Sequence, residues 1–166
     1  MRNAIFLLLV ACGGAQKSGS AGNERVASAD VKPLAGQTAE GKVTFKQTGD
    51  GPVTIELDLS GLAPGTHAFH VHEKGDCGGE FAANAGKHFN PAGAPHPQHA
   101  GDFGNIQAAA DGKAHQVVTA PGITLGEGAT SVANRAVIIH EGTDDLASQP
   151  SGNAGHPIAC GVITMK

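Results

Sequence analysis

The chain has 166 residues, a formal net charge of −4 with histidine neutral, 25 glycines, nine histidines and only 4% aromatic residues. This length suits one domain of ordinary size, and the glycine-rich, aromatic-poor composition favours short strands and turns over a helical bundle. No basic stripe is available to neutralise phosphates, which argues against nucleic acid as a partner.

The first residues have the pattern of an export signal. Arg2 precedes the apolar run 4–10, which is too short to span a bilayer as a helix, and small residues follow it. Leu9-Val10-Ala11-Cys12 resembles the lipobox of bacterial lipoproteins. The sequence therefore predicts a signal peptide over residues 1–11, lipidation of Cys12, and a membrane-anchored lipoprotein exported to the periplasmic or cell-surface side. A plain cleavable signal peptide and a wrongly chosen start codon are the alternatives.

A flexible tether is predicted over residues 12–35, which are rich in small and polar residues, and a folded domain over residues 36–166. Strand-like segments within that domain are 43–47, 53–59, 66–72, 104–110, 114–120, 135–140 and 158–165. Turn signals such as Gly49–Pro52 and Pro121-Gly122 separate them. About eight short strands at this spacing predict an all-β sandwich or barrel.

Two long segments, 73–101 and 141–157, interrupt the strands, and loops of this length in a compact domain are usually functional. Residues that could bind metal gather in or beside them: His70, His72, His88, His96, His99, Asp102 and His140. Histidine is the commonest metal ligand near neutral pH, and several imidazoles are costly to gather without a metal. Histidines with one aspartate suit a closed zinc site, whereas an all-imidazole set suits copper.

The three cysteines leave two readings open. If Cys12 carries lipid, Cys77 and Cys160 remain as a pair, which an oxidising compartment would keep as a disulfide. Metal ligation by thiolate is the alternative, although neither residue belongs to a C-x-x-C pair.

Several segments together resemble the copper–zinc superoxide dismutases of the exported bacterial type. They are His70-Val71-His72-Glu73, Gly86–Pro91, His99–Asn105, Ile139-His140-Glu141 with Asp144-Asp145-Leu146, and Gly152–Gly155 with Ala159–Ile163. The resemblance covers roughly residues 37–166. It implies an eight-stranded Greek-key β-barrel or sandwich with two long functional loops. It also implies dismutation of superoxide to dioxygen and hydrogen peroxide, with copper and zinc as cofactors.

Carried over by position, the resemblance implies a set of site residues. The copper ligands would be His70, His72, His88 and His140, and the zinc ligands would be His88, His96, His99 and Asp102. His88 would be the catalytic proton carrier, shared as an imidazolate that needs the charge of both ions. Asp144 matches a carboxylate that hydrogen-bonds the outer nitrogens of two ligand histidines. Cys77 and Cys160 match the family's disulfide.

The sequence departs from the family where an arginine guides the anion to copper. That position, two residues after Gly155, is Pro157, and the preceding His156 could substitute only when protonated. Both long loops also look shorter than those of the family, and no lysine or arginine lies between Arg135 and Lys166. The sequence therefore predicts an active, weakly steered site whose rate depends less on ionic strength than the family norm.

Two functions remain open at this point. The first is the dismutase, with superoxide as its substrate and a homodimer as an untested option. The second is an extracytoplasmic copper- and zinc-binding protein with little or no dismutase turnover. Outside the metal set, His67 is expected to be structural, His115 exposed, and Arg135 a donor that braces a loop.

Overall fold

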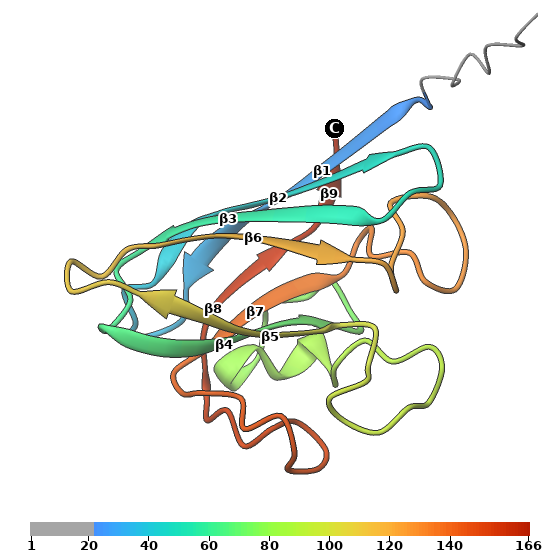
Figure 1. Ribbon diagram of the computed structural model, residues 1–166. Helices are drawn as coiled ribbons and strands as arrows, with labels where there is room; N and C mark the ends of the chain where they lie inside the picture. Colours follow the sequence, from blue (N-terminus) through green and yellow to red (C-terminus); the bar gives the residue numbers. More distant parts are fainter. Residues whose placement is uncertain (1–21) are drawn as a thin grey trace, which may run out of the picture.

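Nine strands and one short helix make up residues 22–166, the part of the chain that this computed structural model describes (Figure 1). The elements are β1 (Glu24–Pro33), β2 (Glu40–Thr48), β3 (Val53–Ser60), β4 (Gly65–His72), the 3-10 helix η1 (Glu80–Ala85), β5 (Asp102–Ala108), β6 (Ala114–Ala120), β7 (Ala136–His140), β8 (Pro157–Val162) and β9 (Thr164–Met165).

The strands form one antiparallel sheet that nearly closes on itself. Their hydrogen-bonded order is β5-β4-β7-β8-β1-β2-β3-β6, and the two-residue β9 pairs with β1. β5 and β6 follow one another along the chain yet stand at opposite ends of this order. The chain crosses the barrel between β3 and β4 and again between β6 and β7, which is a Greek-key arrangement. The predicted all-β Greek-key barrel is confirmed.

Period-two alternation builds the first half of the barrel. In β2 and β3 the inward side chains, among them Val43, Phe45, Ile55 and Leu57, are fully buried, and their neighbours are mostly half-buried or exposed. Each large apolar side chain buried in this way contributes about 1.5–3 kcal/mol relative to an exposed one. This pattern made β3 the clearest strand in the sequence.

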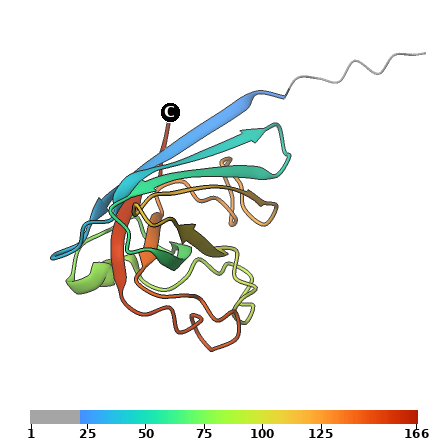
Figure 2. The ribbon, with the colours of Figure 1, turned by 60° about the vertical axis from the view of Figure 1, so that its left-hand side comes forward.

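Most residues of β4, β7 and β8 are buried on both faces of the sheet, because the two long loops cover its outside there. Every residue of β7 is buried. Val137 and Ile139 belong to the barrel core, whereas Ile138 packs outside with Ala85 and Cys160. Loops 73–101 and 141–157 both lie on this side of the barrel (Figures 1 and 2). The outward face of these strands is therefore shielded from solvent and can hold a polar site.

The barrel begins earlier than the sequence predicts. The tether predicted over residues 12–35 is wrong for Glu24–Pro33, which form β1 and pair with β2 along its length. The inward residues of β1 are Ala27, Ala29 and Val31, all fully buried. Because two of the three are alanines, β1 carries too little hydrophobic contrast to stand out from a small-residue linker.

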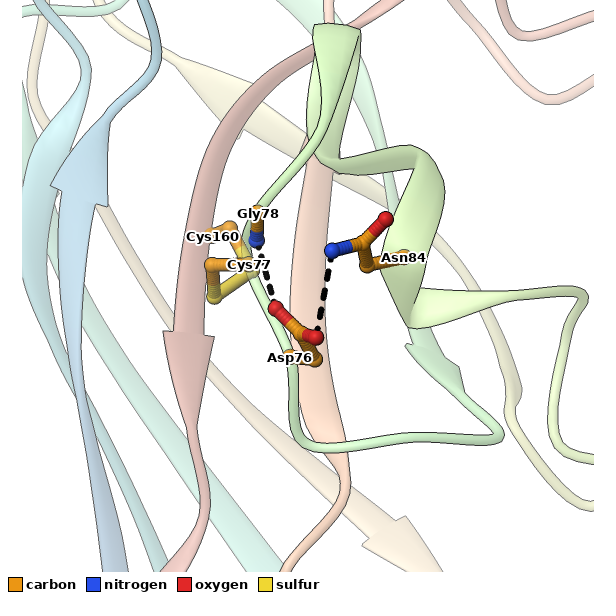
Figure 3. The surroundings of a disulfide bond; sticks show 5 residues. All are labelled: Asp76, Cys77, Gly78, Asn84 and Cys160. Carbon is orange, nitrogen blue, oxygen red and sulfur yellow. Dashed lines mark hydrogen bonds between the residues drawn. A yellow bond between two sulfur atoms is a disulfide. The ribbon is translucent and has the colours of Figure 1, made fainter.

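A disulfide joins the first long loop to β8. Cys77 and Cys160 are bonded, with their Cα atoms 5.8 Å apart (Figure 3). Beside the bond, Asp76 accepts hydrogen bonds from the Gly78 N–H and from the Asn84 side-chain amide of η1. The predicted pairing is confirmed, and the thiolate-ligand alternative is wrong.

Residues 1–21 lie outside the described residues, so the signal peptide and the lipidation of Cys12 stay predictions. Within residues 22–166, no helix has the length and apolar character that crossing a bilayer requires.

Candidate metal centre

Two neighbouring strands supply the base of the site. β4 and β7 are antiparallel, with His70 opposite Ile138 and His72 opposite Ala136. Alternation along each strand puts His70, His72 and His140 on the outer, loop-covered face. His88 joins them from loop 73–101, which is paired to the end of β4 by a bridge between His72 and His88.

The first group comprises His70, His72, His88 and His140, with one potential ligand atom of each within 4.8 Å of the others. Three outer nitrogens have partners: His72 Nδ1 bonds to the Gly86 carbonyl at 2.9 Å, His140 Nδ1 to the Gly155 carbonyl at 3.1 Å, and His70 Nε2 to Asp144 Oδ2 at 2.8 Å. The other nitrogens, His70 Nδ1, His72 Nε2 and His140 Nε2, are buried without any hydrogen-bond partner. Such converging, unpartnered nitrogens fit a metal ion.

The second group gathers around the Asp102 carboxylate. His88 Nδ1 lies 2.7 Å from Oδ1, and the Nδ1 atoms of His96 and His99 each lie 3.0 Å from Oδ2. The His96 contact lacks hydrogen-bond geometry, since His96 Nδ1 has no hydrogen-bond partner despite this distance. Three imidazoles and one carboxylate facing one another are the donor set of a closed zinc site.

His88 belongs to both groups. Its Nδ1 faces Asp102 in the second group, which leaves Nε2 as its ligand atom for the first. The structure thus brings together all seven residues that the sequence singled out as ligands, and it places position 88 where the two groups meet.

Asp144 ties the two groups together from behind. Its Oδ1 lies 2.9 Å from His96 Nε2 and its Oδ2 lies 2.8 Å from His70 Nε2, so one fully buried carboxylate orients a ring in each group. The Asn105 side chain holds the backbone of Asp144 from both ends, accepting from its N–H at 2.8 Å and donating to its carbonyl at 2.9 Å. Asn105 lies at the end of the His99–Asn105 motif, but no pattern in the sequence indicated this role.

Gln149 is a second residue that sequence reasoning missed. Its side-chain oxygen accepts from the His96 N–H at 3.0 Å, and its side-chain nitrogen donates to the His96 carbonyl at 2.6 Å. The tip of loop 141–157 is thereby fastened to loop 73–101 at a residue of the second group.

Replacing Gly152 by alanine is expected to lower the free energy of unfolding by at least about 2 kcal/mol. Gly152 has φ +72°, and a Cβ there would meet Asp144 Oδ1 at 2.0 Å and His96 Nε2 at 2.7 Å. Gly122→Ala is the matched control, because a Cβ at that position meets nothing within 4 Å. Urea unfolding of both variants makes the test, and an equal effect in the two would contradict the steric argument.

Three histidines of the first group, His70, His72 and His140, are held neutral by lowered pKa values. Burial lowers the pKa of His72 to about 3 and that of His140 to about 4, against hydrogen bonds to the Gly86 and Gly155 carbonyls that act in the opposite direction. Burial also lowers the pKa of His70. At Asp102 burial works to raise the pKa, but hydrogen bonding and charge from His88 outweigh it and lower the pKa. Near pH 7 the rings can therefore offer lone pairs and Asp102 a full charge.

The metal-free protein is expected to lose stability on acidification. His72 and His140 titrate near pH 3 and 4 when folded but near 6.5 when unfolded, so below pH 6.5 the unfolded chain binds more protons. Their contribution to stability is complete above pH 6.5 and is lost progressively as the pH falls to the folded pKa values, about 4 for His140 and about 3 for His72. Urea unfolding of the metal-free protein at several pH values measures this loss. A His72→Gln, His140→Gln variant should lose less, and an identical loss would refute the assignment.

A pocket of about 590 Å³ opens onto the first group between the two loops. His72, His88 and His140 line it and are 8%, 5% and 6% exposed, whereas His70 is fully buried. Pro157 also lines it. His156 does not: its ring stacks on Phe81 at a centroid distance of 4.5 Å. The structure thus gives no support to the predicted anion guidance by His156.

The remaining histidines and Arg135 serve structure. His67 is buried, with its ring nitrogens 2.9 Å and 2.8 Å from the carbonyls of His140 and Ala63. His115 is exposed on β6 beside Asp58. The Arg135 guanidinium lies 3.6 Å above the Phe89 ring and donates to two backbone carbonyls, which agrees with the predicted bracing of a loop.

Comparisons with known proteins agree with this geometry. The sequence model of the family described as "Copper/zinc superoxide dismutase (SODC)" matches residues 39–163. The crystal structure of the clock protein EA4 is similar to this chain, with a TM-score of 0.75 and 36% sequence identity. The similarity covers 84% of this chain and 93% of that chain.

Proposed function

Because the chain belongs to the copper/zinc superoxide dismutase family, we propose that it converts two superoxide anions and two protons into dioxygen and hydrogen peroxide. The similar solved structure is that of a clock protein, so the proposal depends on the site rather than on the fold.

Each group of ligands suits one of the two metals. The first group would hold copper through His70, His72, His88 and His140, since an all-imidazole set with one open side suits a redox-active copper ion. The second would hold zinc through His88, His96, His99 and Asp102. Copper, when bound, would supply the one-electron chemistry that takes an electron from one superoxide and gives it to another.

The protein's own residues supply position and protons. His72, His88 and His140 face the pocket, so superoxide meets the first group on their side. When His88 Nε2 is not bound to the metal, it would hold a proton and deliver it to the peroxide that leaves, while Nδ1 stays directed at the second group. Asp144 and the Gly86 and Gly155 carbonyls fix the other three rings, so the set changes little as the charge at its centre changes.

The observation that carries this proposal is the sharing of His88. A protein that only stores metal has no need for one imidazole between two ligand groups. The alternative, a copper- and zinc-binding protein with little turnover, is favoured by one feature, the proline at position 157 where the family has its anion-guiding arginine.

We also propose an extracytoplasmic location, with a lipid anchor at Cys12. The support is the lipobox-like segment and the disulfide between Cys77 and Cys160, a bond that persists in oxidising compartments.

The test is superoxide decay with purified protein loaded with both copper and zinc, beside the same protein loaded with zinc alone. Metal content is measured on the same samples. We expect only the doubly loaded protein to accelerate decay. Protein that contains both metals and leaves the decay at its background rate would establish the metal-binding alternative.

A further inference from the structure

Lys87 is the only lysine or arginine, among the residues that the structure describes, that lines the pocket over the first histidine group. We propose that Lys87 attracts and positions small anions at this pocket, the task that the family gives to the arginine replaced here by Pro157. As a role toward superoxide, this inference rests on the proposed dismutase function. Lys87 lies in the first long loop, far along the chain from Pro157, so no spacing in the sequence pointed to it.

The backbone at Lys87 is fastened to the ligand set on both sides. The Glu73 N–H donates to the Lys87 carbonyl at 2.9 Å, and the Lys87 N–H lies 3.3 Å from Glu73 Oε2. The preceding carbonyl, of Gly86, accepts from His72, and the following residue is the shared His88. The side chain therefore starts from a fixed point beside two histidines of the first group.

The charge of Lys87 is available to an anion. Across residues 22–166, Lys42, Lys46 and Lys113 each have a carboxylate within 4 Å, whereas Lys87 has none. Its side chain is exposed at the pocket. Glu73 is the opposing charge on the same pocket, and its Oε2 already accepts from the Lys87 backbone.

The other basic side chains near the pocket are engaged in contacts elsewhere. Arg135 lies over Phe89, with hydrogen bonds to the carbonyls of Ser131 and Glu73, and His156 is stacked on Phe81. An anion that enters the pocket toward His72, His88 and His140 thus meets one lysine, Lys87, among the residues that line it.

The test uses the copper- and zinc-loaded protein and its Lys87→Gln and Lys87→Arg variants, with Lys74→Gln as control. Lys74 is an exposed lysine of the same loop that does not line the pocket. Azide is titrated and followed by the absorption of copper(II). Lys87→Gln is expected to weaken azide binding about three-fold at low salt, the effect of one surface charge several ångströms away, and to flatten its salt dependence. Lys87→Arg should restore both.

Superoxide decay measured on the same samples separates the two proposals. If azide affinity falls only in Lys87→Gln while no sample dismutes superoxide, the anion site stands and the proposed function fails. If Lys87→Gln and Lys74→Gln weaken azide binding equally, or neither does, Lys87 has no special role, and activity in all samples would leave the dismutase intact.

Discussion

A His88→Ala variant loaded with copper and zinc is expected to lose superoxide dismutase activity by at least about 100-fold, the loss typical when a positioned proton donor is removed. His88 is the only residue that belongs to both ligand groups, with Nδ1 2.7 Å from Asp102 Oδ1 and Nε2 left for the first group. Its removal takes one candidate ligand from each group and, in the proposed reaction, the proton carrier from the pocket. The measurement is the rate of superoxide decay per bound copper, with both metals quantified.

The matched control is His115→Ala. This histidine is exposed on the outside of β6, where it contacts Asp58, and it lies in neither ligand group. Its variant should keep its metals and its rate. A His88→Ala protein that kept activity within a few-fold of the parent would show that the shared imidazole is not needed for turnover.

Loss of the disulfide is expected to cost about 4.5 kcal/mol in the free energy of unfolding, the chain-entropy value for a closed loop of this length. Cys77 and Cys160 are 83 residues apart in sequence, and their bond fastens loop 73–101 to β8. A Cys77→Ser, Cys160→Ser double variant, compared with the parent in urea unfolding, measures the effect.

Reduction of the parent protein provides the control for this variant, because it breaks the bond without changing a side chain. Both should lower stability by a similar amount if unfolding is two-state. A loss below about 1 kcal/mol in both cases would mean that the segment around Cys77 is held by its other contacts, such as those of Asp76, and that the unfolded chain gains little from the bond.

The sequence predicted the parts of the fold whose pattern is local. β3 alternates strictly between apolar and polar residues and was found with bounds that differ by one residue from Val53–Ser60. β1 was missed because Ala27 and Ala29 bury little surface. The helix η1 was missed because Glu80–Ala85 carries no helical period in its sequence. Phe81 and Ala82 also have left-handed backbone angles, φ 51° and 57°, which a regular helix does not have. Packing of Ala82 and Ala85 against the barrel stabilises this helix.

The candidate ligands and the supporting carboxylate of Asp144 could be identified from their motifs, but the supports Asn105 and Gln149 could not. Gln149 reaches His96 across 53 residues, and Lys87 reaches the pocket only because loop 73–101 folds back on β4. His156 fails in the opposite way. Pro157, the next residue, lines the pocket, whereas the His156 ring stacks on Phe81. Contacts of this kind depend on how two loops meet, which no spacing in the sequence encodes.

The Asp144 carboxylate has a consequence for how the two proposed metal positions influence one another. One rigid side chain holds His70 on one side and His96 on the other. An ion that captures either ring also restrains the carboxylate, and through it the ring at the second position. Occupancy of one position should therefore raise the affinity of the other, and thermodynamic linkage requires the gain to be the same in both directions. The centre is then expected to fill cooperatively rather than as two independent compartments.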